Sequence, residues 1–432
     1  MAAYLASQQT REAECECVGT STEANDYDTD VYHGMEEYEI QRKMADPIVF
    51  AASSDPDIVY LHEAMKQPDK KQFVKAMLDE VTTHTERGHW KIVPITEVPS
   101  GTKILSAVWA MRRKRRILSR EIYKWKARLN VHGGQQTHGV DYWETYAAAL
   151  KWSSVRFFLV QAIINRWHTR HLDFVLAYPQ ADVECDLYLE IPQGFEFAGS
   201  RKTAHCLKLI KHLYGSKAAG RVWQQHLFKG LDELGYTQST TDECVFYKGS
   251  TIFMVYTNDG IFCGPDQNEI DKCMKEMGQC FDITDKGAID EYLGVKVTHL
   301  EDGTISLTQP HLIDSIIADL GFKANTKGKD TPAPSTASIN RDLNGAPHSE
   351  SWEYRSVIGK LNYLEKSTRP DIAFAVHQCA RYSSNPKESR SHAVRYIVRY
   401  PMKTRDKGII LKPNEHSFEC YIDANFQGGC DI

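Results

Sequence analysis

The chain has 432 residues, of which 42% are hydrophobic and 25% are charged, and its formal net charge is −5. This length has room for two or three domains, and the apolar content excludes a wholly disordered chain. No apolar run approaches the roughly 18 residues that a transmembrane helix needs, and the N-terminus lacks a secretory signal pattern, so a membrane-spanning or secreted protein is not expected.

Charge is spread unevenly along the chain. Residues 1–60 hold 13 acidic residues against three basic ones, a local charge of −10, which predicts an acidic, disordered tail or linker. By contrast, residues 111–130 (MRRKRRILSREIYKWKARLN) carry nine basic residues and one acidic residue, with Tyr123 and Trp125 among them. This basic, aromatic stripe suits a polyphosphate partner, whereas a solvated charged surface is the alternative that charge alone leaves open.

The cysteines and histidines do not suggest a metal site. The 11 cysteines include no CxxC pair, which favours buried or incidental thiols in a reducing compartment over disulfides or zinc ligands. The isolated histidines are interpreted as packing or surface residues, and they include His132, His138, His171 and His377.

The first predicted elements are a helix and a β-rich segment. Residues 70–90 predict a helix, because apolar residues recur at helical spacing before a glycine stop: Phe73, Met77, Val81 and Gly88. The basic stretch that follows, to about residue 130, is expected to be rich in strands. Residues 151–166 (KWSSVRFFLVQAIINR) predict a buried helix behind a serine N-cap. Residues 168–178 (HTRHLDFVLAY) predict a strand that runs into a turn.

A helix, a hairpin and a second helix are predicted next. Residues 218–235 predict a helix with Trp223, Leu227, Leu231 and Leu234 on one face and Gly235 as its C-terminal cap. Residues 254–263 (MVYTNDGIFC) have apolar arms on either side of a polar tip, which predicts a hairpin with Asp259-Gly260 as the turn signal. Residues 268–281 predict an amphipathic helix.

The C-terminal part begins with a change of composition. Residues 325–350 are rich in Pro, Ser, Asn and Gly, which predicts a domain boundary. A helical block follows over 352–404, and residues 417–426 (SFECYIDANF) are strand-like. Because strands and helices are mixed along the chain without regular alternation, the sequence predicts an α+β fold.

Two aspartates stand out for their chemistry. Asp173 ends an apolar strand and Asp259 lies at the hairpin tip, 86 residues further along the chain. If the strand and the hairpin are neighbours in one sheet, both carboxylates emerge at the same edge, where they repel each other unless a cation intervenes. Mg²⁺ takes oxygen ligands, and two such ions stabilise an in-line phosphoryl displacement. The alternative is that Asp259 is only a turn former.

Several ordered blocks resemble the polymerase motifs of copia-type retrotransposon reverse transcriptases: LDFVLAYPQADVECDLYLEIPQGF (172–195), CLKLIKHLYGSKAAGRVW (206–223) and VYTNDGIFCGP (255–265). Further blocks resemble the N-terminal and C-terminal parts of that family, at 73–94, 123–147, 292–297, 358–386 and 392–411. The resemblance covers roughly residues 60–432.

The resemblance implies a right-hand polymerase of α+β class, with fingers, a palm built on a small antiparallel sheet, and a thumb. It implies RNA-directed DNA synthesis with two Mg²⁺ ions, or Mn²⁺ instead, with deoxynucleoside triphosphates and an RNA/DNA primer-template as partners. The implied location is intracellular, in a cytoplasmic virus-like particle or the nucleus. The expected division is 1–60 tail, 61–325 fingers and palm leading into the thumb, 326–350 linker, 351–412 helical thumb or connection, and 413–432 the start of a ribonuclease H domain.

The resemblance also suggests roles for single residues. Asp173 resembles the first metal-binding aspartate, and Asn258 and Asp259 fall on the family's metal-binding pair. Tyr178 resembles the aromatic gate that collides with a ribose 2′-hydroxyl.

Lys126 and Arg128 resemble the fingers residues that hold the incoming triphosphate, which basic side chains suit. Lys217 is also expected to bind the nucleotide, and it lies with Arg221 in the block that supports the nucleotide pocket; solvated surface bases are the alternative for these two.

Asp423 resembles the first catalytic position of the family's ribonuclease H domain. Only nine residues follow it here, whereas that domain needs over a hundred. The ribonuclease H portion is therefore expected to be truncated and inactive, and the chain is interpreted as a fragment of a polyprotein or a gene model cut from an element.

The chain departs from the family at the hairpin, where Tyr-x-Asp-Asp is usual and Tyr256-Thr257-Asn258-Asp259 stands here. Asn offers a metal one neutral oxygen in place of a carboxylate, so impaired polymerase activity is expected. Smaller departures fall at Ala148, Ser216, Ala218 and Pro401, the last expected to break a helix. The two readings are a weakened polymerase and a catalytically dead relic that only binds nucleic acid.

Overall fold

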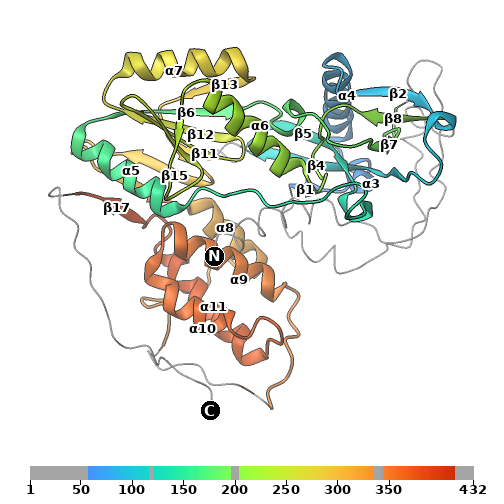
Figure 1. Ribbon diagram of the computed structural model, residues 1–432. Helices are drawn as coiled ribbons and strands as arrows, with labels where there is room; N and C mark the ends of the chain where they lie inside the picture. The colour runs from blue at the N-terminus through green and yellow to red at the C-terminus, as the bar shows by residue number, and fades with distance from the viewer. Residues whose placement is uncertain (1–56, 116–120, 196–203, 335–341, 343, 414–432) are drawn as a thin grey trace.

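The computed structural model describes residues 57–115, 121–195, 204–334, 342 and 344–413. It shows a mixed fold of helices and small, mainly antiparallel sheets, arranged in three groups of elements (Figure 1). The acidic N-terminal range up to residue 56, the strand-like residues 417–426 and Asp423 lie outside the described residues. No helix within the described ranges is both long and apolar enough to cross a membrane.

The first group combines two small sheets with helix α4 (Lys70–Glu86). One sheet has the order β1-β4-β5 and the other the order β2-β8-β7-β3, in which only β3 and β7 run parallel. The strands are β1 (Ile58–Val59), β2 (Trp90–Pro94), β3 (Ile104–Leu105), β4 (Ala107–Arg115), β5 (Ile122–Val131), β7 (Tyr188–Glu190) and β8 (His205–Leu209). The short helix α3 (Leu61–Ala64) precedes α4, and the 3₁₀ turns η2 (Ile95–Glu97) and η3 (Gly133–Gln135) lie between strands.

Helix α4 confirms the first helix prediction. Its apolar stripe, Phe73, Met77 and Val81, is buried in the core of this group. The helix ends before Gly88, whose φ of 66° lies in the left-handed region that glycine adopts without strain. The β-rich character predicted for the segment up to residue 130 is confirmed by β4 and β5.

The second group is built on a six-stranded antiparallel sheet with the order β13-β6-β12-β11-β10-β9. Its strands are β6 (His168–Phe174), β9 (Thr237–Gln238), β10 (Val245–Lys248), β11 (Thr251–Tyr256), β12 (Asp259–Gly264) and β13 (Ile283–Gly287). Helices α6 (Ala219–Glu233) and α7 (Gln267–Cys280) share a core with side chains of one face, such as Leu172 and Phe262. Helix α5 (Trp152–Asn165) packs with the other face, which includes Met254 and Ile261.

The third group is mostly helical. Helices α8 (Pro310–Asp319), α9 (Tyr354–Ser367), α10 (Ala373–Ala380) and α11 (Glu388–Lys403) share one hydrophobic core. Between this bundle and the six-stranded sheet lies a four-stranded sheet of β14 (Glu291–Tyr292), β15 (Val295–His299), β16 (Ile305–Thr308) and β17 (Ile409–Leu411) (Figure 1). Because β17 pairs with β16, the chain returns from the bundle to the sheet that precedes it.

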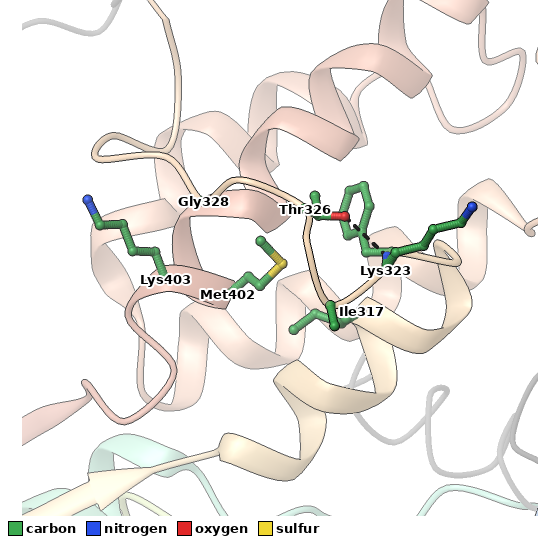
Figure 2. A pocket seen from close by; sticks show the side chains of 8 residues that line it. Ile317, Lys323, Thr326, Gly328, Met402 and Lys403 are labelled. Carbon is green, nitrogen blue, oxygen red and sulfur yellow. Dashed lines mark hydrogen bonds between the residues drawn. The ribbon is translucent and has the colours of Figure 1, made fainter.

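A shallow pocket of about 340 Å³ lies between the C-terminal ends of α8 and α11 and the loop after α8. Ile317, Phe322 and Met402 give it an apolar lining, while the charged ends of Lys323 and Lys403 point away from it (Figure 2). Polar groups do not converge on this pocket, so it gives no reason to place a functional site in the bundle.

The predicted serine N-cap of the 151–166 helix is wrong. Helix α5 begins at Trp152 with Lys151 as its N-cap, and no side chain of the cap residue closes it. Instead, the carboxylate of Asp242 accepts a hydrogen bond from the Lys151 backbone N–H at 3.0 Å and from the Ser154 hydroxyl at 2.6 Å. An acid distant in sequence thus satisfies the helix terminus, and local sequence carries no signal for it.

The predicted position of the hairpin turn is also wrong. The two turn residues are Thr257 and Asn258, and Tyr256 pairs with Asp259 across the hairpin. Thr257 takes the left-handed conformation, with φ of 52°. Asp259 is therefore a strand residue, and its interpretation as a turn former fails.

Gly260 is needed for packing and not for the turn. A Cβ atom at this position would lie 2.7 Å from the Phe253 ring and 3.1 Å from Leu172. The Asp-Gly dipeptide was thus a misleading turn signal. Glycine is needed at position 260 because the Phe253 ring occupies the space that a side chain would take.

Two further expectations concern helix ends. Gly235 follows α6 with φ of 83°, which confirms the predicted glycine cap. Pro401, by contrast, lies inside α11, which continues to Lys403, so the predicted helix break is wrong. The proline sits in the last turn, where a missing N–H removes only one hydrogen bond.

Candidate functional site

The two aspartates meet in the six-stranded sheet. Strands β6 and β12 pair antiparallel, and Asp173 and Asp259 are direct partners in that register. Directly opposed residues point to the same face with Cβ atoms about 4.5–5.5 Å apart. The expectation that strand and hairpin are neighbours is therefore confirmed. Both carboxylates lie on the face of the sheet that also carries His171 and Ile261, opposite the face covered by α6 and α7.

Asn258 is bonded to the first of these aspartates. Its side-chain Nδ2 donates to Asp173 Oδ1 at 2.9 Å. Because an ionised carboxylate can only accept, the amide must present its NH₂ group to this partner. The turn is held by two further bonds: Phe174 N–H donates to the Asn258 carbonyl at 2.7 Å, and Trp223 Nε1–H donates to the Thr257 carbonyl at 2.7 Å.

Two basic side chains, Lys286 and His171, lie next to the carboxylates. Lys286 of β13 places Nζ 3.9 Å from Asp173 Oδ2. His171 of β6 places Nε2 3.4 Å from Asp259 Oδ1, and its ring packs edge-on against Tyr292. The sequence did not single out Lys286, and His171 was interpreted as a packing or surface residue. No spacing rule links either residue to an aspartate on another strand.

The residues of this site fit one divalent ion. Mg²⁺ is commonly held by one or two carboxylates together with substrate phosphates, and Asp173 and Asp259 supply two carboxylates on one face. A third protein oxygen would come from Asn258 only if its amide turned and released Asp173. Within the described ranges, no group of three or more His, Cys, Asp or Glu residues is arranged to hold a metal.

A basic face lies on the hairpin of β4 and β5. We define it by five residues whose positions alternate with core residues on the two strands: Arg112, Lys114, Lys124, Lys126 and Arg128. Arg112 is the register partner of Lys126, and Lys114 that of Lys124. The alternate positions on the same strands, such as Met111, Ala127 and Leu129, are buried in the core.

Crowding on this face changes the acidity of two lysines. Burial lowers the pKa of Lys126 to about 7, and the neighbouring charges of Arg128 and Lys114 add to the effect. Burial, followed by Arg128, Arg112 and Lys124, likewise lowers the pKa of Lys114, and Asp173 opposes this shift. Asp173 therefore lies near enough to Lys114 to act on its charge.

Tyr178 lies in a group of side chains that includes a residue of this face. It is partly buried in the 3₁₀ turn η4 (Tyr178–Gln180), and desolvation raises its pKa to about 12. Its ring centroid is 4.9 Å from that of Tyr214, and the guanidinium of Arg128 lies over the Tyr214 ring at 4.2 Å. Two predicted nucleotide-binding residues are therefore joined through Tyr214, a residue that sequence reasoning quoted within a block but did not single out.

The other two predicted basic residues are tied to the segment after β5. The backbone N–H of Lys217 donates to Gln136 Oε1 at 2.7 Å, and its side chain lies close to Gly133. Arg221, in the first turn of α6, forms an ion pair with Glu144. Neither contact involves Asp173 or Asp259.

The seven cysteines in the described part of the chain are free thiols, and five of them are buried. The five buried thiols agree with the interpretation of the cysteines as buried or incidental thiols. None of their contacts links them to the carboxylate pair.

Comparison with known proteins places this geometry in context. Residues 89–334 match a family model described as reverse transcriptase (RNA-dependent DNA polymerase). The chain is 30% identical over 390 residues to the retrovirus-related Pol polyprotein from transposon TNT 1-94 of Nicotiana tabacum, an alignment covering 88% of this chain and 29% of the relative.

Two further relatives extend the comparison. The retrovirus-related Pol polyprotein from transposon RE1 of Arabidopsis thaliana is 29% identical over 389 residues, covering 89% of this chain and 26% of the relative. The putative transposon Ty5-1 protein of Saccharomyces cerevisiae is 23% identical over 261 residues, covering 59% of this chain and 83% of the relative. The chain thus spans less than a third of the two plant polyproteins.

Proposed function

Because the chain belongs to the reverse transcriptase (RNA-dependent DNA polymerase) family, we propose that it is the polymerase portion of a copia-type retrotransposon. In this proposal it adds deoxynucleotides to a primer paired with an RNA or DNA template. The observation that carries the proposal is the register pairing of Asp173 with Asp259, together with the face of five basic side chains on β4 and β5.

The three groups of elements support a right-hand division. We assign the two sheets around β4, β5 and β8 to the fingers, the six-stranded sheet to the palm, and the bundle of α8–α11 to the thumb (Figure 1). Because α8 shares the core of the bundle, the thumb in this proposal begins near residue 310, before the expected linker at 326–350. Residues 413–432 remain the proposed start of a ribonuclease H domain, and residues 1–60 the proposed acidic tail.

The site residues take the following proposed roles. Asp173 and Asp259 would hold a divalent ion, Mg²⁺ or Mn²⁺, which when bound acts as a Lewis acid on the reacting phosphate. Lys126 and Arg128 would bind the triphosphate of the incoming nucleotide. The partly buried ring of Tyr178 would leave no room for a ribose 2′-hydroxyl and so exclude ribonucleotides. By the family's character, the proposed location is a cytoplasmic virus-like particle or the nucleus.

We further propose that Asn258 impairs this copy. Unit charges about 4 Å apart attract by about 4 kcal/mol at an effective permittivity of about 20, and a divalent ion roughly doubles this. A loss of about 4 kcal/mol from the transition state slows the reaction about 10³-fold. In addition, the Asn258 amide donates to Asp173 Oδ1 and thereby competes with a metal for that oxygen.

Primer extension on an RNA template with Mg²⁺ tests the proposal. The Asn258→Asp variant should extend the primer at least about 100-fold faster than the unaltered chain, because a carboxylate replaces a neutral oxygen next to the ion. Asn258→Ala is the matched control, since it removes the amide without adding charge, and it should not restore the rate. Equal rates for the Asp variant and the unaltered chain would exclude Asn258 as a metal-site residue.

The second candidate is a relic that only binds nucleic acid. The basic face favours it, because phosphate contacts supply most sequence-independent affinity whether or not catalysis occurs. Salt-dependent binding of a heteroduplex without extension, even by Asn258→Asp, would support this second function over the first.

A further inference from the structure

The charge of the carboxylate pair is partly balanced by a lysine of the neighbouring strand. Lys286 of β13 lies with Nζ 3.9 Å from Asp173 Oδ2, while the Asn258 amide donates to Oδ1 of the same carboxylate at 2.9 Å. The protein therefore supplies a partner for each oxygen of Asp173. A divalent ion that binds Oδ2 meets a positive charge 3.9 Å from that oxygen, and the two cations repel each other.

An irregularity in β13 places this lysine. Strand β13 pairs with β6, and Asp285 is the register partner of Leu172 (Figure 1). The next paired residue is Gly287, which lies opposite His171, so Lys286 is left over as the extra residue of a β-bulge. Bulges re-aim side chains and are frequent beside active sites.

The bulge is held by contacts on both sides of the lysine. Arg170 of β6 donates through Nε to Asp285 Oδ1 at 2.8 Å, and a second bond joins Arg170 Nη2 to Asp285 Oδ2. The same Oδ1 accepts from the Gly287 backbone N–H at 2.8 Å. Gly287 has a φ of 80°, a left-handed conformation that glycine adopts without strain. The backbone that carries Lys286 is therefore fixed against the strand that carries Asp173.

The side chain of Lys286 is held less firmly than its backbone. It is 45% exposed, and the 3.9 Å between Nζ and Asp173 Oδ2 is longer than a hydrogen bond. A half-exposed ion pair of this kind contributes little to stability, so a stronger cation can replace it. The pair is therefore suited to neutralise the site reversibly and not to hold the sheet together.

We propose that Lys286 is an internal counter-ion of the carboxylate pair, which a divalent metal ion must displace from Asp173. The inference rests on the proposed function in one respect, namely that Asp173 and Asp259 bind a divalent ion. It goes further because it assigns control of the metal affinity to a lysine. Without metal, the lysine reduces the repulsion between the two carboxylates, and with metal its charge opposes the ion.

Manganese binding tests the proposal without nucleotide or nucleic acid. Free Mn²⁺ gives an electron paramagnetic resonance signal that is lost when the ion binds, so a titration of the full chain yields a dissociation constant. Lys286→Met keeps most of the length of the side chain and removes its charge. It should bind Mn²⁺ about 3–10-fold more tightly than the unaltered chain, because the ion no longer displaces an ion pair or meets the lysine charge.

Three further variants make this result specific. Lys286→Arg keeps the positive charge and should bind Mn²⁺ no more tightly than the unaltered chain. Lys272→Met removes an equal charge from α7, which packs on the opposite face of the sheet, and should change the dissociation constant less than about 2-fold. In an Asp173→Asn background, Lys286→Met should give no gain, because the carboxylate that the lysine neutralises is absent.

The outcomes separate this inference from the proposed function. Equal, measurable affinities for Lys286→Met and the unaltered chain would overturn the counter-ion, as would the absence of Mn²⁺ binding by all of these proteins. A gain that Lys272→Met matches, or that persists in the Asp173→Asn background, would overturn the assignment to this carboxylate. If Lys286→Met gains affinity as expected but neither it nor Asn258→Asp extends a primer, the counter-ion stands and the polymerase function fails.

Discussion

At the scale of single residues, the carboxylate pair is stabilised from within the protein. Asp173 accepts a hydrogen bond from Asn258 and lies near Lys286, while Asp259 lies near His171. In a site with a second acid at position 258, three carboxylates would face one another, and one would protonate or require a cation. The asparagine therefore relieves repulsion at the same place where it removes a ligand.

This balance predicts a metal-dependent change in stability. In EDTA, Asn258→Asp should lower the free energy of unfolding by about 1–3 kcal/mol, because a partly buried hydrogen bond is lost and like charges meet. Mg²⁺ should restore the variant's melting temperature and leave that of the unaltered chain nearly unchanged. Differential scanning calorimetry with and without Mg²⁺ measures both shifts. An Asp variant that is equally stable in EDTA and in Mg²⁺ would contradict a metal site at this position.

A second residue-scale prediction concerns Lys126, whose pKa is about 7 in the folded protein. Below pH 7 the amine is charged before any ligand binds. Above pH 7 it is largely neutral, so a triphosphate must draw in a proton to gain the ion pair. Affinity for a deoxynucleoside triphosphate should therefore fall by up to about 10-fold per pH unit between pH 7 and 9.

Isothermal titration with a dideoxy-terminated primer-template measures this dependence without catalysis. Lys126→Arg is the control, because a guanidinium stays charged throughout this range, and its affinity should be nearly constant above pH 7. An identical pH profile for both proteins would show that Lys126 does not contact the triphosphate.

The lowered pKa of Lys126 also makes the stability of the ligand-free protein depend on pH. The unfolded chain holds the lysine proton up to its ordinary pKa near 10.4, whereas the folded chain releases it near 7. The penalty for burying the charged amine is thus complete below pH 7 and fades as the pH rises from 7 toward about 10.

At the scale of elements, the hairpin of β11 and β12 depends on close packing behind its tip. Gly260→Ala should destabilise the protein by about 1–3 kcal/mol, because the new methyl group meets the Phe253 ring and has no free space. Gly278→Ala in α7 is the matched control: its Cβ would lie 3.6 Å from Ile283, an ordinary contact, and alanine favours a helix over glycine by about 0.5–1 kcal/mol. Urea denaturation should therefore shift in opposite directions for the two variants.

The elements also show which predictions local sequence supports. Helices α4, α6 and α7 follow from the spacing of their apolar residues, and each was predicted close to its observed ends. The cap of α5 could not be predicted, because Asp242 reaches it from a distant loop. The hairpin turn was misplaced because Asp-Gly is a turn signal on its own, whereas here the glycine fits beneath Phe253.

The contacts of the candidate site also include some that the sequence could predict and some that it could not. The sequence placed Asp173 near the end of one strand and Asp259 at the tip of the hairpin, but it gave their pairing only as a condition, which the register now meets. The contacts of Lys286, His171 and Tyr214 could not be predicted, since each depends on which strands become neighbours. Periodicity tells which face of a strand a residue occupies and does not tell which strand lies beside it.

At the scale of the whole molecule, hydrogen bonds link the helical bundle to helix α5, which packs on the six-stranded sheet, and to the turn between β14 and β15 of the four-stranded sheet. Arg156 of α5 donates through Nη2 to the carbonyl of Ser367 at 3.0 Å and to that of Lys366, at the C-terminal end of α9. Tyr363 of α9 donates its hydroxyl to the Leu293 carbonyl. A basic group at a helix C-terminus satisfies carbonyls that lack partners within the helix.

Loss of the Arg156 hydrogen bonds should increase local unfolding of the bundle relative to the sheet. Arg156→Met should cost about 1–3 kcal/mol and raise hydrogen exchange in α9 more than in the core strands of the sheet. Arg355→Met is the control, because Arg355 bonds to Ser383 inside the bundle and does not cross to the sheet. Uniform protection in Arg156→Met would show that packing alone joins the two groups.

The contacts of Tyr214 with Arg128 and Tyr178 have one more consequence. The side chain proposed to bind the phosphates and the ring proposed to exclude the 2′-hydroxyl both contact the Tyr214 ring. Because a shift of one side chain would disturb the other, the affinity for the triphosphate and the discrimination against ribonucleotides should change together among variants of these residues. A substitution selected for its effect on one of these two properties would therefore also change the other.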